Sequence, residues 1–249
     1  MFLTAYLLLM SAVLLAWKIN PTGSLGVFLY ITAFHFGFGD TLTTIRMPAL
    51  VRVADIIGRG GTVLTFPALF YQDDVYLLFS YLVPQHGAWE LAQLLAKMAP
   101  LVAVAIMGSI VWNVVRLFSH KAIVSLSRAM ELIAIAFAFS LLPPLLAFTI
   151  YFSFLHSARH LLYVAGSTDA DKILPSIRFT LKRSVPVTLV TIGLALVAYL
   201  LLAEVGLDLV RLTQVIFVGI AGVTYPHVAV IALAQREKVL RYRASLLSI

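Results

Sequence analysis

The fold is decided by residues 132–164, LIAIAFAFSLLPPLLAFTIYFSFLHSARHLLYV, which contain no Asp, Glu, Lys or Arg before Arg159. A hydrocarbon core of about 30 Å is crossed by about 20 helical residues, so this stretch is long enough for two spans. Pro143 and Pro144 divide it, because proline removes a backbone donor and disfavours helix in the residue before it. The sequence therefore predicts two transmembrane helices joined by a tight turn.

The rest of the chain has the same apolar character. Of its 249 residues, 61% are hydrophobic and 12% are charged, and the mean hydropathy is +1.00. Soluble domains are about 45–50% apolar and about 25% charged. The apolar runs are continuous, which favours helices over a membrane β-barrel. We expect an all-α, polytopic integral membrane bundle of seven to eight spans, with residues 1–249 forming a single domain.

Eight apolar segments can be drawn along the chain. The third is interrupted by Gln72, Asp73 and Asp74, so we expect it to be broken or partly interfacial. The eight segments cover about 2–17, 24–44, 61–83, 98–117, 124–142, 145–164, 184–203 and 209–234.

The basic residues predict the orientation of these spans. Cytoplasmic loops of membrane proteins carry an excess of Lys and Arg, and this bias explains the net charge of +7 without a nucleic-acid partner. With the N-terminus in the cytoplasm, most of the eighteen basic residues fall on inner segments. We therefore predict a multi-pass protein of the plasma membrane with both termini cytoplasmic. The inner basic residues are Arg46, Arg52, Arg59, Arg116, Lys121, Arg128, Lys172, Arg178, Lys182, Arg183, Arg236, Lys238, Arg241 and Arg243.

Histidine and carboxylates must carry any metal chemistry, because the chain has no cysteine. Ionisable groups inside a bilayer are costly and usually serve a function. His35 lies in the second segment, and His156 and His160 form an i, i+4 pair that projects from one face of the sixth. His35 and His156 are each about 17 Å from the outer end of their segments, at about 1.5 Å per residue. This pattern predicts a metal site of three imidazoles, although a lone buried histidine is more often a packing residue.

Other side chains are candidates for the surroundings of this site. Asp40 is either an orienting partner for a ligating imidazole or a buried partner for an arginine. His227 follows Pro226 and is either an extra ligand or a partner for polar groups freed by the proline. Arg159 either binds a lipid headgroup or a carboxylate or, as we expect, extends towards the membrane interface. The predicted substrate lining is aromatic and consists of Phe34, Phe38, Tyr151 and Phe152.

Imidazole ligands without thiolates suit Fe, Zn or Cu. Hydrolysis by a zinc-bound water would need a carboxylate base near the metal, for which Asp40 is the obvious intramembrane candidate. Dioxygen chemistry at iron needs no such base and suits an apolar substrate that arrives from the lipid. The residues favour an iron oxygenase modestly, and they indicate no catalytic nucleophile.

Several motifs together resemble the Brp/Blh family of membrane β-carotene dioxygenases. The resemblance extends from about residue 25 to residue 235, and it implies oxidative cleavage of β-carotene by dioxygen at the central double bond. The products would be two retinal molecules, and the cofactor would be non-haem Fe(II) held by four histidines. His35, His156 and His160 fall on three of the ligand positions. The matching elements are Phe34-His35-Phe36-Gly37 with Asp40, Arg59-Gly60 with Pro67, Tyr151-Phe152 with His156-Ser157 and Arg159-His160, and Pro226-His227.

The fourth histidine of the family stands in an earlier span, and no histidine precedes His35 here. Set against the resemblance, either an N-terminal helix is missing from the sequence, which we favour, or the site is incomplete, and His227 could substitute for the fourth ligand. Two other classes of function stay open. One is a non-catalytic carotenoid- or retinal-binding helper that supplies a rhodopsin chromophore, and the other is a transporter or proton relay that uses intramembrane His and Asp.

Overall fold

A computed structural model describes residues 2–41, 47–118, 122–159, 161–162, 173–202 and 208–247. Throughout these ranges the regular structure is helical and includes no β-strand. The chain is therefore all-α, as predicted. The elements are α1 (Phe2–Ile19), α2 (Pro21–Thr41), α3 (Ala49–Phe70), α4 (Gln72–Ser80), α5 (Gln85–Val115), η1 (Arg116–Phe118), α6 (Ala122–Leu141), α7 (Pro144–Ile150), the π-helix η2 (Tyr151–Ser157), α9 (Ile173–Leu201) and α10 (Asp208–Leu247).

Prolines and polar residues break the helices where the sequence indicates. α6 ends at Leu141, and Pro143 caps the start of α7, so two helices replace one long one. The third apolar segment is also broken, because α3 ends at Phe70 and α4 starts at Gln72. α3 starts at Ala49, well before the predicted boundary at residue 61. Its first turns contain polar residues, which is why the hydropathy pattern left them outside the segment.

Five of the described helical segments are long and apolar enough to cross a membrane. They support a polytopic membrane protein, although they leave the predicted number of eight spans unconfirmed. Shorter apolar helices occupy Thr4–Ile19 and Pro144–Ser157. The five segments are Ala49–Phe70, Gln85–Phe118, Ile123–Leu141, Ile177–Leu201 and Asp208–Leu233.

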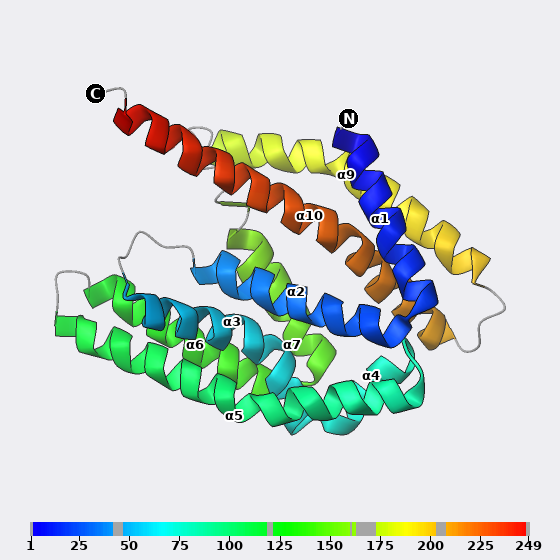
Figure 1. Cartoon of the computed structure of the whole chain (residues 1–249), viewed down its shortest axis with the longest axis horizontal. Helices are drawn as coiled ribbons and strands as arrows, with labels where there is room; N and C mark the ends of the chain where they lie inside the picture. Colours follow the sequence, from blue (N-terminus) through cyan, green and yellow to red (C-terminus); the bar gives the residue numbers. More distant parts are fainter. Residues whose placement is uncertain are drawn as a thin grey trace.

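α3 is the central helix of the bundle, since it packs against α2, α5 and α6 (Figure 1). α10 is the longest helix and crosses the molecule obliquely, with α1 and α9 packed against it (Figure 1). On α9 the apolar side chains are largely exposed, and Leu189, Val190 and Leu194 each keep more than half of their surface accessible. An apolar surface of this extent needs a non-aqueous environment, which a lipid bilayer provides.

Glycines let α2 and α3 approach closely. A Cβ atom added at Gly60 would lie 1.8 Å from the carbonyl oxygen of Ala33, and one at Gly37 would lie 2.1 Å from that of Ile56. Neither distance leaves room for a methyl group, so only glycine fits at this crossing. The close contact of α2 and α3 fixes the part of α2 that carries His35 and Asp40.

Two arginines that the sequence analysis counted on the inner side lie inside the bundle. Arg59 on α3 is fully buried and Arg128 on α6 is 5% exposed. They pair with carboxylates described below, so they act as internal counter-ions and give no information on orientation. The loop position expected for Arg59 was wrong, because a buried ion pair lowers the hydropathy of a helix and makes it resemble a loop. Arg128 lies in a helix, in keeping with the drawn segment 124–142.

Candidate metal centre and its carboxylate network

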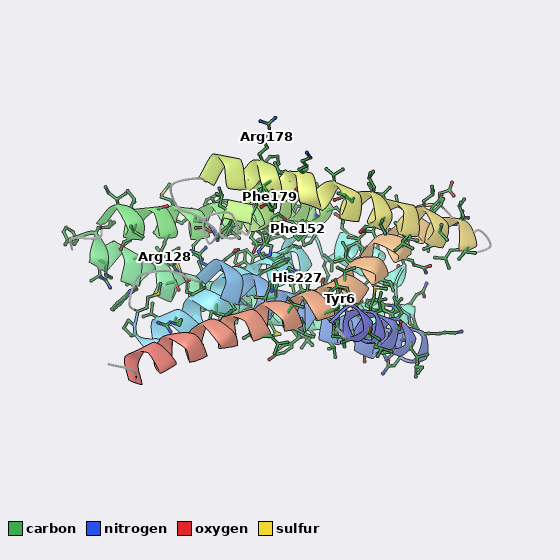
Figure 2. The ribbon with its side chains drawn as sticks, turned by 90° about the horizontal axis from the view of Figure 1, so that it is seen from above. Tyr6, Arg128, Phe152, Arg178, Phe179 and His227 are labelled. Atoms are coloured by element: carbon green, nitrogen blue, oxygen red, sulfur yellow. The ribbon has the colours of Figure 1, made fainter. Side chains whose placement is uncertain are left out.

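His35 contacts two other histidines, each from a different helix. The imidazole of His35 on α2 lies 5.2 Å from that of His156 on η2, measured between ring centroids. The ring of His35 also lies 5.4 Å from that of His227 on α10. Figure 2 shows His227 near the centre of the molecule, in contrast to Arg178, which projects outward from α9.

These separations can be compared with those of imidazole rings that share one ion. A ligating imidazole nitrogen lies about 2.1 Å from a first-row metal ion, which places the ring centroid about 3.2 Å from the ion. Two such rings at ordinary coordination angles have centroids roughly 4.6–5.3 Å apart. The distances from His35 to His156 and to His227 lie at or just above the upper end of that range, and the donors are of the type that iron accepts.

His160, the predicted partner of His156, lies outside the described residues. Within the part of the chain that the structure describes, no three His, Asp or Glu side chains form a group that could hold an ion. The assignment of His35, His156 and His160 as metal ligands therefore stays a prediction. The structure adds that the ring of His227 lies against that of His35, and both alternatives for His227, an extra ligand and a partner for groups freed by Pro226, stay predictions.

His156 lies in a π-helix, η2, which covers Tyr151–Ser157. Short π-helical segments inside α-helices are rare and occur frequently at functional sites. In an α-helix, residues five positions apart are rotated by about 140° around the axis. The i→i+5 pattern of a π-helix brings them near one face, and Tyr151 and His156 both reach Asp40 for this reason.

Aromatic rings surround His156. Its ring lies 4.6 Å from that of Phe36 in a T-shaped arrangement and 6.0 Å from that of Phe152 in a stacked one. Phe152 is 40% exposed, so it is available to an apolar ligand, whereas Tyr151 is buried at 4%. Phe34 and Phe38, the other two predicted lining residues, stack on each other at 5.7 Å on the exposed side of α2.

Asp40 is the carboxylate next to the histidines, and it is 4% exposed. Its Oδ1 atom lies 3.4 Å from Nδ1 of His156 and 3.0 Å from Nη1 of Arg159. Its Oδ2 atom accepts a hydrogen bond of 2.7 Å from the Tyr151 hydroxyl. Asp40 therefore lies beside both kinds of partner that the sequence left open, an imidazole and an arginine, while its role towards a metal ligand stays a prediction.

The ionic contacts continue from Arg159 into the core. Arg159 also donates to Oε1 of Glu131 at 2.5 Å, and Arg59 donates to the same oxygen at 2.6 Å. Arg59 in turn binds Oδ2 of Asp55 at 3.0 Å. Arg128 and Thr41 donate to that oxygen of Asp55 as well. The expected extension of Arg159 to the membrane interface is thus replaced by contacts with two carboxylates.

Several members of this network escaped the sequence analysis, namely Asp55, Glu131 and the roles of Arg59 and Arg128. A signal for them was present, because Asp55 and Arg59 have the i, i+4 spacing of a helical ion pair. Glu131 also stands alone as an acid between two long apolar runs. Charged residues inside a membrane bundle usually pair with one another, so these positions could have been matched.

Comparison with known proteins gives the family. The profile of the β-carotene 15,15'-dioxygenase family matches residues 1–235. A curated relative, the β-carotene 15,15'-dioxygenase of the uncultured marine bacterium 66A03, is 27% identical over 234 residues, which cover 92% of this chain and 78% of the relative. No solved structure matches the chain. On the strength of the family match, which spans nearly the whole sequence, this chain belongs to the β-carotene 15,15'-dioxygenase family.

Proposed function

We propose that the protein is a membrane-embedded non-haem iron dioxygenase that cleaves β-carotene at its central double bond. One β-carotene and one dioxygen molecule would give two molecules of retinal. The observation that carries the proposal is the contact of His35 with both His156 and His227, in a chain whose family is named for this reaction. The retinal would be available to a rhodopsin-type protein.

The proposed ligands of Fe(II) are His35, His156 and His160, with His227 placed beside His35 as an additional donor. Bound iron would supply the activation of dioxygen that the cleavage requires. The chain itself holds the imidazoles in place, through the packing of α2 on α3 and through the contact of Asp40 with His156. An imidazole that donates its other ring nitrogen to a carboxylate is fixed in orientation and becomes a stronger donor.

The protein surface suits a substrate dissolved in lipid. β-Carotene is a long apolar polyene, so it would enter sideways from the bilayer rather than from water. Phe34, Phe38 and Phe152 present partly exposed rings on the elements that carry His35 and His156. Their role would be to position the central bond of the polyene against the site, since the choice of bond depends on where the substrate is held.

A proton relay is less consistent with the network of Asp40, Arg159, Glu131, Arg59 and Asp55. Each carboxylate in it is paired with at least one arginine. Guanidinium groups stay protonated in proteins and do not release protons. The network is therefore better suited to holding charges in place than to moving protons.

Expression of the protein in a bacterial host that accumulates β-carotene tests the proposal. We expect loss of carotenoid colour, extractable retinal, and iron in the purified protein. His156→Ala should abolish retinal formation and lower the iron content. Full retention of β-carotene in cells that contain the membrane-inserted, iron-loaded protein would contradict the enzymatic function and favour a carotenoid-binding helper.

A further inference from the structure

Asp40 contacts Tyr151 and Arg159 in addition to His156. The Tyr151 hydroxyl donates to one carboxylate oxygen at 2.7 Å, and Arg159 approaches the other at 3.0 Å. Nδ1 of His156 lies 3.4 Å from that second oxygen. Between them, Tyr151 and Arg159 fix both oxygens and hence the plane of the carboxylate that faces the imidazole.

Each of these two residues is anchored elsewhere. The ring of Tyr151 packs in T-shaped contacts at 5.3 Å from Phe36 and 5.7 Å from Phe139, inside the buried core of α2, α6 and η2. Arg159 is held by Glu131, and Glu131 is held in turn by the fully buried Arg59. Asp40 is therefore tied to α3, α6 and η2 at the same time.

The network is balanced in charge. It contains three arginines, Arg59, Arg128 and Arg159, and three carboxylates, Asp40, Asp55 and Glu131. Nδ1 is the ring nitrogen of His156 that faces Asp40, at 3.4 Å, so Nε2 is the nitrogen left to face another partner.

We propose that Tyr151 and Arg159 are positioning residues, which hold Asp40 against Nδ1 of His156 so that His156 binds the metal through Nε2. This inference rests on the proposed function, because it takes His156 to be a ligand. It assigns to Tyr151 a role through its hydroxyl, in place of the substrate contact that the sequence suggested.

The test uses Tyr151→Phe, which keeps the buried ring and removes only the hydroxyl, and Arg159→Lys, which keeps the charge and loses the fork that bridges Asp40 and Glu131. Metal-free protein in detergent is titrated with Co(II), whose visible absorption reports both the affinity and the ligand geometry. We expect each variant to weaken Co(II) binding about 10-fold or more, the usual effect of losing an outer partner of a ligating histidine. We also expect an altered Co(II) spectrum.

Tyr76→Phe is the matched control, since Tyr76 packs against Trp89 at 5.6 Å in a different core cluster. It should bind Co(II) like the unmodified protein. Arg159→Met should weaken binding more than Arg159→Lys, because it removes the charge as well. Thermal melting of every variant separates a loss of folded protein from a loss of affinity.

Unchanged Co(II) affinity and spectrum in both Tyr151→Phe and Arg159→Lys would overturn the inference. The inference would also be overturned if the unmodified protein bound no Co(II). That result would contradict the proposed metal site as well. No carotenoid is present in the titration. A protein that binds Co(II) with the expected dependence on Tyr151, but cleaves no β-carotene, would support the positioning role and contradict only the proposed reaction.

Discussion

His35 on α2 and His227 on α10 lie edge to face, with their ring centroids 5.4 Å apart and their planes inclined by 80°. The two residues belong to opposite ends of the chain, and α10 reaches this position while packed against α1 and α2. The contact therefore joins the C-terminal helix to the part of the protein that carries Asp40 and, through it, His156.

If His227 is a metal ligand, His227→Ala will weaken Fe(II) binding at least about 10-fold, since loss of even an outer partner of a ligand costs that much. Iron content per folded protein after dialysis at defined Fe(II) concentrations is the measurement. His86→Ala is the control, because His86 is an exposed residue that pairs with Glu90 at 3.2 Å. Equal iron retention by the two variants would assign His227 to packing.

Chelation of the metal should abolish retinal formation, and Fe(II) should restore it. Imidazole ligands also accept zinc, so zinc will rebind but will not support the reaction, because it has no redox chemistry. Retinal is measured after each addition. Restoration by zinc, or full activity in protein shown to contain no metal, would refute iron as the cofactor.

Glu131→Gln should destabilise the protein strongly. The change removes the charge that Arg59 and Arg159 share, and it leaves the fully buried Arg59 with Asp55 alone. Breaking a buried ion pair by removing one partner costs about 3–5 kcal/mol. The melting temperature in detergent is the measurement, with Glu90→Gln at an exposed position as the control. A small and equal effect of both changes would show that solvent or lipid headgroups screen the network.

Gly60→Ala should also destabilise the protein, by about 1–3 kcal/mol, because its methyl group would collide with the carbonyl oxygen of Ala33. Gly108→Ala serves as the control, since a Cβ atom there meets nothing within 4 Å. Thermal melting compares the two. The collision would push α2 away from α3, so we expect Gly60→Ala to reduce iron binding too. Similar stability of both variants would mean that the helices shift freely.

Much of the fold could be predicted from the sequence because hydropathy and proline act locally. The break at Pro143 and the interruption after Phe70 are confirmed for that reason. The early start of α3 was missed, since Arg52, Asp55 and Arg59 lower its hydropathy while two of them are neutralised inside the bundle. The local hydropathy pattern around Arg59 cannot indicate that Glu131, from a helix distant in the sequence, neutralises it.

The candidate site was predictable in part. The equal depth of His35 and His156 in their two spans predicted that they would lie close together, and the structure places their rings 5.2 Å apart. The contact between His35 and His227 depends on the path of α10 across the bundle. That path cannot be predicted from the spacing of residues along the sequence. Likewise, the widened helix at Tyr151–Ser157 has no simple sequence signature, and only the structure shows that Tyr151 and Asp40 meet.

The π-helical segment also makes the site sensitive to how tightly the chain winds between Tyr151 and Ser157. A π-helix holds one surplus residue relative to an α-helix. If the same residues wound as an ordinary α-helix, His156 would stand about 140° from Tyr151 around the axis instead of near one face. Tyr151 would stay on Asp40 while His156 and Arg159 turned away, so a change of winding alone would dismantle the centre even though every named side chain remained in the protein.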